Sequence, residues 1–517
     1  MGMEAGTEAA RAGRLTFVSR KQESLHTYGV EGATIVNVYQ LLGTPAWIRT
    51  ALDRVLSHTG SRSPGIDGKT RSDFQTEDAR ARLATEIAAE MRDKSYRPRP
   101  VRRIHIPKSS DPSKLRPLGI STIKDRTVQE AVRMILEPVY EPKFHPHSYG
   151  FRPFRNAHHA MYRIHYLASR PGNAAYEWVV EGDIRDCFGA IDHGILLGIL
   201  RRTISDRPFL KVMALMLKAG ALEGLQYMPS EQGSPQGSGV SPLWANIYLS
   251  ELDRFIAQKY ASLDVGAKRR LAKEPEAAPC EIVRYADDFV IMVRGSKADA
   301  ERLKQQTAEF LRSELRMELS REKTLVTHIR EGFTFLGFEV RRITLKRDRR
   351  SRVWIRPSQK SVRRYRENVM EVLRRMGNSS DEVVLVKTLN AVTNGWSRYF
   401  AIGVCWPTFH RLSLWLWRAV NDALYHKHKG RRYRSWTQHA RDYWIPYSCS
   451  EAPKDRWRQG RGIGVWSDAL RTRAWILALP AHTPWQPIRP FGRYDPYDPQ
   501  DREVLHARRA TTHRRRA

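Results

Sequence analysis

The sequence predicts a mixed α/β protein with antiparallel strand pairs, followed by a helical part. Residues 282–293 form an apolar, β-branched run that two adjacent acids interrupt, as expected for two strands joined by a tight turn. Apolar residues between Thr122 and Leu136 recur on one side with a helical period. After about residue 345 helical periodicity dominates, in SQKSVRRYRENVMEVLRRM, DEVVLVKTLNAVTNGWSRYF and TFHRLSLWLWRAVNDALYHKH. This mixture of hairpins and helices is typical of α+β architectures.

The remaining elements follow from local patterns. TPAWIRTALDRVLSHT predicts a helix near the start, and the turn-rich SRSPGIDGKT leads to a second helix-like segment. SYRPRPVRRIHIPK predicts an extended strand that ends at Pro107. YEWVVEGDIRDCFGAID predicts a strand, an acidic loop and a helix from about His193, whereas residues 297–317 predict a helix and EGFTFLGFEV a strand pair. From about residue 440 Trp, Pro and Arg are frequent and no clean period is present.

Length and composition favour a globular protein of several domains. The chain has 517 residues, enough for more than one hydrophobic core. No apolar run is long enough to span a bilayer, and the start, MGMEAGTEAARAGRLTF, lacks the apolar region of a secretory signal. Four cysteines are far apart and form no C-x-x-C pair, so neither a zinc knuckle nor a disulfide framework is indicated. We expect a soluble cytoplasmic protein with no membrane partner.

The charge balance indicates a polyanionic partner. Lys and Arg number 88 against 55 Asp and Glu, a formal net charge of +33. An excess of this size favours nucleic acid, because cations displace the counterions of a phosphate backbone. A solvated or membrane-surface charge excess is the alternative. Interleaving of the cations with Trp, Tyr and His over long stretches favours nucleic acid over a lipid surface.

The two adjacent acids Asp287 and Asp288 in RYADDFVIMV are the first candidate for chemistry. They could simply occupy a hairpin turn, since Asp is a common turn residue. Alternatively they hold a divalent cation, which would relieve their mutual repulsion and which prefers carboxylate oxygens. A phosphoryl-transfer site needs a third acid. Asp183 follows an apolar strand end in VVEGDIRDCF and supplies one, with Asp186 and Asp192 as nearby competitors.

Seven blocks in a fixed order resemble those of a reverse transcriptase of the group II intron maturase type. They are RPLGISTIKDRTVQEAV, SYGFRP, GDIRDCF, SPQGSGVSPLWANIYLSELD, RYADDFVIMV, LSREKT and FLGF, spread over about 240 residues. The resemblance implies a right-hand polymerase with fingers, palm and a helical thumb. It implies an N-terminal extension over 1–60, fingers and palm over 61–345, a thumb or maturase domain over 355–440, and an irregular basic C-terminal region over 441–517.

The resemblance assigns roles to residues of the polymerase site. Asp183, Asp287 and Asp288 match the acids that hold two Mg²⁺ ions, with the Ile184 carbonyl as a further ligand. Phe188 matches an aromatic gate that presses against a ribose 2′-OH and favours dNTPs; an ordinary core Phe is the alternative.

Cations and a glycine-rich loop complete the expected site. Lys108 in HIPK and Arg116 in KLRPLG match residues that grip the incoming triphosphate, as suits a point charge and a bidentate clamp; solvated surface cations are the alternative. Lys323 in LSREKT matches a lysine that protonates the leaving pyrophosphate, or is a charged surface residue. In SPQGSGVSP, Gln236 is the polar side chain of a block whose glycines allow close backbone approach, or form a flexible loop.

The helical part resembles the domain that family members use to bind their own intron RNA. Aromatic stacking and phosphate contact are expected from Trp396, Arg398, Tyr399, Arg431 and Arg432. Trp415 and Trp417, at helical spacing, are expected in the core. Many relatives end in an HNH endonuclease with paired cysteines, but none follow Cys449, so DNA cleavage by the protein itself is not expected. Gly189 also departs from the family, which usually has Asp after the aromatic gate.

These expectations define one principal function and two alternatives. The principal one is an RNA-directed DNA polymerase that extends a DNA primer 3′-OH with dNTPs on an RNA template. It also binds intron RNA as a maturase, to promote splicing and insertion into a target DNA. A non-catalytic RNA-binding splicing factor that keeps the polymerase fold would lack an acid or a triphosphate cation, and all are present. A polymerase recruited to another role, such as phage defence or repair, is the third possibility.

Overall fold

The computed structural model describes most of the chain in two compact units. The described residues are 2–108, 111–170, 175–223, 226–229, 232–234, 237–260, 278–320, 322–345, 351–376, 381–428, 435, 445–446, 463–467, 472–476 and 497. The first unit comprises Met1–Arg163, Val180–Val326 and Arg489–Ala517. The second comprises Ile164–Val179 and Thr327–Ile488.

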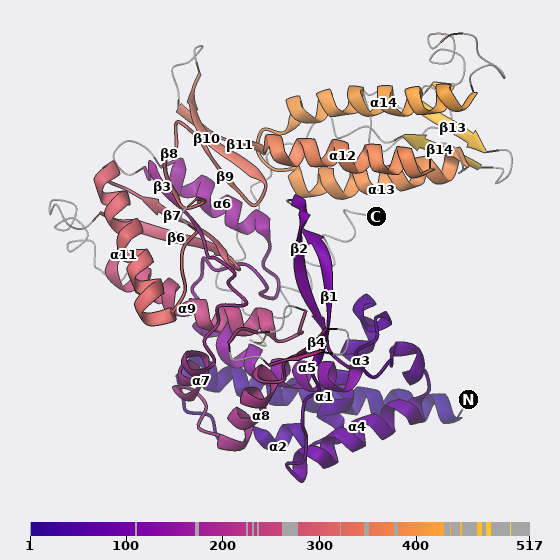
Figure 1. Cartoon of the computed structure of the whole chain (residues 1–517), viewed down its shortest axis with the longest axis vertical. Coiled ribbons are helices and arrows are strands. Elements are labelled where there is room, and N and C mark those ends of the chain that lie inside the picture. The colour runs from indigo at the N-terminus through magenta and orange to yellow at the C-terminus, as the bar shows by residue number, and fades with distance from the viewer. Residues whose placement is uncertain are drawn as a thin grey trace. The chain divides into compact units, whose positions relative to one another are not determined.

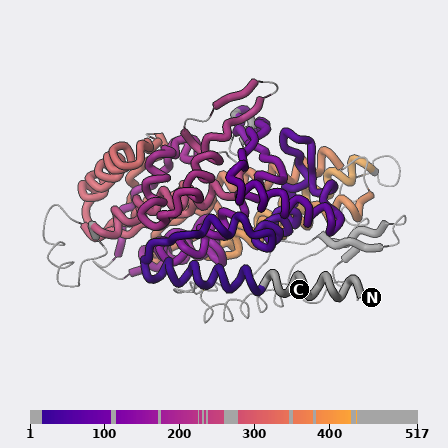
Figure 2. The backbone as a smooth tube through the Cα atoms, turned by 90° about the horizontal axis from the view of Figure 1, so that it is seen from below, coloured from indigo at the N-terminus to yellow at the C-terminus, as the bar shows by residue number. Residues whose placement is uncertain are grey.

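Helices form the base of the first unit. The helices α1 (Gly2–Glu31), α3 (Pro45–Ser57), α4 (Glu77–Arg92) and α5 (Ile123–Tyr140) pack against one another, with the short α2 (Tyr39–Leu42) beside them (Figure 2). Thr122 caps α5 by accepting a hydrogen bond from the Asp125 amide at 3.0 Å. The apolar positions that predicted this helix are fully buried, and Trp47 of α3 donates its indole N–H to the Ala131 carbonyl at 3.1 Å. α5 is therefore the central helix of this layer.

A long hairpin extends from these helices (Figure 1). The strands β1 (Val101–Lys108) and β2 (Asp111–Ile120) pair antiparallel, and β1 also pairs parallel with the short β4 (Ala221–Glu223). β5 (Gln226–Met228) completes the sheet in the order β2-β1-β4-β5. The outer part of the hairpin exposes Ile106, Leu115 and Arg116. It therefore presents side chains to solvent instead of burying them.

A second sheet, in the order β6-β7-β3-β8, carries the acidic residues. Its strands are β3 (Trp178–Asp183), β6 (Cys280–Tyr285), β7 (Asp288–Val293) and β8 (Leu325–His328). Of the remaining first-unit helices, α9 (Ser241–Tyr260) contacts β6, α11 (Lys297–Leu315) contacts α9, and α7 (His193–Arg201) contacts α8 (Arg207–Leu217) and α9. The edge strand β6 and its neighbour β7 bury most of their side chains, which explains their continuous apolar sequence.

The second unit combines small sheets with three long helices. β9 (Phe333–Phe335), β10 (Phe338–Thr344) and β11 (Ser351–Pro357) form an antiparallel meander, followed by α12 (Gln359–Met376), α13 (Glu382–Phe400) and α14 (Trp406–His428). A third sheet contains β12 (Ile445–Pro446), β13 (Ile463–Ser467) and β14 (Thr472–Ile476), and its last two strands contact α13. Helix α6 (Ala157–Ala168) crosses the division between the two units.

The mixed α/β prediction is confirmed, and so are most predicted elements. The hairpin over 282–293, the strand to Pro107, the helix from His193, the strand pair at 333–340 and the three late helices are all present. Several elements were not predicted, among them α6 and α8. Helix α1 lies in a stretch read only as polar, and the region after residue 440, expected to be irregular, contains the β12-β13-β14 sheet. Strands of five residues or fewer are too short to establish an alternating period.

No helix among the described residues combines the length and the apolar character needed to cross a bilayer.

Candidate active site

The turn between β6 and β7 presents the two adjacent acids. Tyr285 pairs with Asp288, which leaves Ala286 and Asp287 as a two-residue turn. Ala286 has φ of +60°, the left-handed backbone region that a tight hairpin turn requires at its first central position. A residue other than glycine is strained there, so the turn needs support from its surroundings.

The neighbouring strand β3 brings the third acid alongside this turn. β3 lies next to β7 in the sheet and ends at Asp183. A side chain at Gly182 would begin 2.1 Å from the ring of Phe289 on β7, so only glycine allows this close approach. The ring of Phe289 and the missing side chain at Gly182 thereby set the spacing between Asp183 and the hairpin acids.

Backbone hydrogen bonds fix the chain just after Asp183. The Ser320 amide donates to the Asp183 carbonyl at 2.8 Å, and the Arg185 amide donates to the Glu318 carbonyl at 2.9 Å. These bonds flank a bridge between Ile184, which is buried, and Leu319. The backbone of Ile184 is therefore held in place directly beside Asp183.

The pKa values of the two hairpin acids, Asp287 and Asp288, are both raised. Burial of the carboxyl group, and then repulsion from Asp287 and Asp183, raises the pKa of Asp288 to about 6. Burial also raises the pKa of Asp287, and the charge on Asp183 adds to this rise, while Arg116 and Arg284 oppose it. The Asp288 residue nevertheless keeps an exposed surface, through which a cation can reach the carboxylates. The nearby positive charge is therefore insufficient to bring the pKa of Asp287 and Asp288 back to the ordinary value.

Lys323 supplies part of that charge. Its ammonium donates to Asp183 Oδ2 at 2.9 Å, although its side chain remains 67% exposed. This hydrogen bond is the main cause of the raised pKa of Lys323. Among the residues that the structure describes, no three His, Cys, Asp or Glu side chains stand close enough together to enclose a metal ion. The donor set is nevertheless suited to Mg²⁺, because the acids are hard oxygen donors that still repel one another.

Of the four expected nucleotide-binding residues, the structure describes the side chains of two, Arg116 and Phe188. Arg116 is exposed on β2, and its charge acts on Asp287. Phe188 is half-buried in the loop after β3, where its carbonyl accepts a hydrogen bond from the Ser234 amide at 2.8 Å. Lys108 ends β1, but its side chain lies outside the described part, as does the whole of Gln236.

Glycines around Gln236 permit close backbone packing within the protein. Gly233 has φ of +86°, and a side chain there would begin 2.9 Å from the Gly189 carbonyl oxygen. Gly237 has φ of +108°, and a side chain there would begin only 2.6 Å from the Gly119 carbonyl oxygen. A side chain at Gly189 would itself meet the Asp186 carboxylate. Family members usually have Asp at the position of Gly189. In this chain the glycine fits the close packing of the loop.

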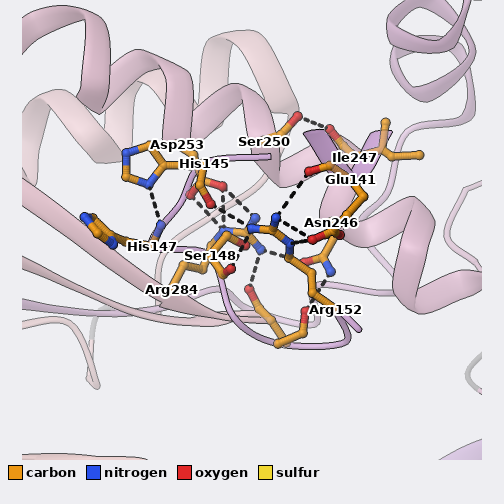
Figure 3. A network of polar contacts seen from close by, with 12 residues as sticks. Glu141, His145, His147, Ser148, Arg152, Asn246, Ile247, Ser250, Asp253 and Arg284 are labelled. Carbon is orange, nitrogen blue, oxygen red and sulfur yellow. Dashed lines mark hydrogen bonds and ion pairs between the residues drawn. The ribbon is translucent and has the colours of Figure 1, made fainter. Parts of the chain in front are cut away.

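A buried polar network supports the hairpin from behind (Figure 3). Arg284 of β6 is 0% exposed, and its guanidinium donates to both carboxylate oxygens of Asp253, to the Asn246 side-chain oxygen and to the Ala286 carbonyl. Asn246 in turn donates to the Gly150 carbonyl at 2.8 Å. The strained turn residue is therefore bonded directly to the network, which the sequence motifs did not identify.

The segment before Gly150 completes the support. The Arg284 amide donates to the His147 carbonyl at 3.0 Å, and the Tyr149 amide donates to the Arg284 carbonyl at 2.9 Å. The His147 ring stacks on Tyr149 and lies 3.2 Å from its hydroxyl. Burial, and then the electrostatic effects of Arg163, His145 and Arg155, lower the pKa of His147 to about 2. His147 is therefore a neutral part of this packing.

The expected RNA-binding residues of the second unit differ in their surroundings. Trp396 packs among aromatic rings, with centroids 4.8 Å from Tyr365 and 4.7 Å from Phe400. Arg398 and Tyr399 are exposed on α13, although the Tyr399 hydroxyl donates to the Leu336 carbonyl at 2.9 Å. Arg431 and Arg432 lie outside the described residues.

An exposed aromatic pair on α14 was missed by the sequence patterns. Trp406 is 46% exposed and stacks on His410, with the ring centroids 5.7 Å apart and the planes at 14°. Trp415 and Trp417, expected in the core, are half-buried. The spacing of Trp406 and His410 by four residues was the available signal, but such spacing does not distinguish an exposed helix face from a buried one.

Comparisons with known proteins agree with this geometry. Residues 106–340 match the family of the reverse transcriptase (RNA-dependent DNA polymerase), and residues 362–444 match the group II intron, maturase-specific domain. The chain therefore belongs to the group II intron reverse transcriptase and maturase family. Its reverse transcriptase domain implies dependence on a divalent metal ion.

The region aligned with this chain covers a different share of each relative. Protein YkfC of Escherichia coli is 34% identical over 355 residues, which are 64% of this chain and 90% of that protein. Group II intron-encoded protein LtrA of Lactococcus lactis subsp. cremoris is 38% identical over 348 residues, 59% of this chain but 56% of that protein. Nuclear intron maturase 1, mitochondrial, of Arabidopsis thaliana is 25% identical over 286 residues, 41% of this chain and 40% of that protein.

Replacing Gly150 with alanine tests the support of the turn. An added Cβ would lie 2.3 Å from the Ala286 backbone nitrogen, so either the turn or the 147–150 segment must shift. We expect Gly150→Ala to lower the rate of dNTP incorporation by about tenfold or more, because small displacements of reacting groups are costly. Gly198→Ala is the matched control, since nothing lies within 4 Å of a Cβ there. Equal rates for both variants would contradict the proposed support.

The neutral state of His147 predicts a pH dependence of folding. Its pKa is lowered in the folded protein, so below about pH 6.5 the unfolded chain binds a proton that the folded chain excludes. Acidification should therefore destabilise the protein from pH 6.5 downward. We expect His147→Gln to flatten the fall of the urea midpoint between pH 6.5 and about 4.5. His58→Gln alters an exposed histidine as a control; the same flattening in both variants would refute this assignment.

Proposed function

We propose that this chain copies RNA into DNA at the site formed by Asp183, Asp287 and Asp288. The observation that carries this proposal is the placement of these acids at the ends of the adjacent strands β3 and β7, where burial and the charge of neighbouring acids raise the pKa of Asp287 and Asp288. Uncompensated carboxylates at one edge of a sheet are suited to holding divalent cations. The sheet with its acids would be the palm of a right-hand polymerase, the β1–β2 hairpin part of its fingers, and α12–α14 its thumb.

The three carboxylates would hold two Mg²⁺ ions, with the Ile184 carbonyl as a further oxygen donor. When bound, such ions stabilise the charge on the entering and leaving oxygens of nucleotidyl transfer. The protein's own contribution is to hold the acids in place, through Gly182 and Phe289 on one side and the buried network on the other. Lys323, which donates to Asp183, would release it as metal binds and protonate the leaving pyrophosphate.

The incoming dNTP would lie between the acids and the β1–β2 hairpin. Arg116 and Lys108 would grip its triphosphate, which fits the exposure of Arg116 and the effect of its charge on Asp287. Phe188 would press against the ribose, and its loop is tied to Ser234. Gln236 would contact the nucleotide from the same glycine-rich loop. The primer 3′-OH then attacks the α-phosphate, and pyrophosphate leaves.

The second unit would bind the intron RNA in which such proteins are encoded. The match to a maturase-specific domain and the net charge of +33 support this role. Arg398 and Tyr399 are exposed and can contact phosphate and bases, with Arg431 and Arg432 adding charge. Trp396 would act through the core that positions them. Binding would promote splicing and intron mobility into target DNA, in the cytoplasm.

The domain boundaries stay a prediction. They are an N-terminal extension over 1–60, fingers and palm over 61–345, a thumb over 355–440 and a basic C-terminal region over 441–517. The matched families fall inside the second of these and across the end of the third.

Substituting one acid tests the proposed site. We expect Asp287→Asn to abolish Mg²⁺-dependent dNTP incorporation on a primed RNA template, because it removes a charged ligand at nearly constant size. RNA binding, measured by filter retention, should remain as in the wild type. Asp186→Asn, an exposed acid on the neighbouring loop, should keep at least half of the activity. Incorporation by Asp287→Asn at the wild-type rate would overturn the site. Absence of synthesis by folded, RNA-binding wild type would favour a non-catalytic splicing factor.

A further inference from the structure

Arg284 lies two residues before Ala286, the first residue of the turn, and its charge is completely buried. Its Nε donates to the two Asp253 oxygens at 2.9 and 3.1 Å, and its Nη2 donates to Oδ2 at 2.6 Å. Its Nη1 donates to Asn246 Oδ1, as Figure 3 shows, and to the Ala286 carbonyl, each at 2.9 Å. The guanidinium thus connects a carboxylate, an amide and the turn itself.

Both side-chain partners of Arg284 come from α9. Asn246 and Asp253 are seven residues apart, which places them two turns apart on the same face of the helix. α9 begins four residues after Gly237, the glycine that packs against the β1–β2 hairpin. Arg284 therefore ties the hairpin that carries Asp287 and Asp288 to the helix that follows the glycine-rich loop.

The turn depends on fixed neighbours. Ala286 adopts a left-handed conformation that is unfavourable for a residue with a side chain. Its carbonyl accepts from Arg284, and its amide nitrogen packs against Gly150, whose carbonyl accepts from Asn246. Strain of this kind persists only where the surroundings hold it. The Arg284 network therefore restrains both the peptide group before Ala286 and the peptide group after it.

A buried ion pair of this type is not the simplest way to add stability. Removing two charges from water costs several kcal/mol per ion, and apolar replacements of similar volume are often as stable. What an apolar replacement could not supply is the directed bond to the Ala286 carbonyl. The network is therefore better explained by the position it imposes on the turn than by the stability it adds.

We propose that Arg284 is a positioning residue for polymerisation: held by Asp253 and Asn246, it fixes the Ala286–Asp287 turn and thereby the spacing of the carboxylates that bind metal. This inference rests on the proposed metal-binding role of Asp183, Asp287 and Asp288. It assigns Arg284 no contact with substrate. Its effect is on the affinity of the site for divalent cations, since residues that orient metal ligands commonly change that affinity by roughly 10- to 100-fold.

The test compares three variants of the full-length chain. Arg284→Lys keeps the charge but loses the planar fork, and Asn246→Ala removes one partner and leaves the ion pair. The control is Arg49→Lys, because Arg49 is also nearly buried and bonded to two acids, Asp53 at 3.1 Å and Glu77 at 2.5 and 2.6 Å, but it belongs to α3. Mn²⁺ binding without substrate is measured by electron paramagnetic resonance. Mg²⁺ dependence of incorporation, dNTP KM and the thermal midpoint are measured in parallel.

We expect Arg284→Lys to weaken Mn²⁺ binding and to raise the half-saturating Mg²⁺ concentration, each by roughly tenfold. Asn246→Ala should shift both in the same direction by a smaller factor. Arg49→Lys should lower the thermal midpoint and leave both metal readouts at the wild-type values. Binding of the primed template should be unchanged in all three.

Two results would overturn the inference. One is wild-type Mn²⁺ and Mg²⁺ affinity in a folded Arg284→Lys; if that variant does not fold, wild-type metal affinity in Asn246→Ala has the same meaning. The other is an equal loss of metal affinity in Arg49→Lys, which would indicate general destabilisation. Failure of the underlying metal site would look different, because Asp287→Asn would then bind Mn²⁺ as tightly as the wild type.

Discussion

The buried ion pair between Arg284 and Asp253 is the interaction on which, in our proposal, the hairpin that carries Asp287 and Asp288 depends. The pair holds a permanent positive charge next to the turn that leads into Asp287 and Asp288. Through its bond to the Ala286 carbonyl, the guanidinium supports the backbone of that turn. A buried arginine is tolerated only when its donors are satisfied. Here they are satisfied by side chains of α9 and by the Ala286 carbonyl. The bonds that compensate for burial of the charge therefore also hold the turn. Sheet, helix and turn are thereby fixed relative to each other.

The front of the hairpin has the opposite character. There Asp183, Asp287 and Asp288 bring negative charge together, and Lys323 neutralises only part of it. A rigid support behind the acids limits the rearrangement that cation binding requires to the side chains at the front, such as Lys323. The close contact of Gly182 with Phe289 sets the remaining spacing. The positive charge of the whole chain suits a nucleic-acid substrate at such a site.

The sequence predicted those features that depend on local pattern or on a recognisable motif. The β6–β7 hairpin, α5 and α11 carry strong periods and were confirmed, and the family followed from ordered motifs that include the three acids. The support of the site could not be predicted in this way. Arg284, Asp253 and Asn246 are among many polar residues, and only the fold shows that they are buried together. Likewise Trp406 and Trp396 look alike in sequence, yet one is exposed and the other packs among rings.

Metal-directed cleavage of the backbone tests most directly whether the three acids form one cation site. Fe²⁺ replaces Mg²⁺, ascorbate and peroxide generate hydroxyl radicals at the bound ion, and the cut positions are mapped by mass spectrometry. The account predicts cuts close to Asp183 and to Asp287–Asp288 together, suppressed by excess Mg²⁺ and absent in Asp287→Asn. Cuts confined to other segments, or cuts at these positions that persist in Asp287→Asn, would contradict it.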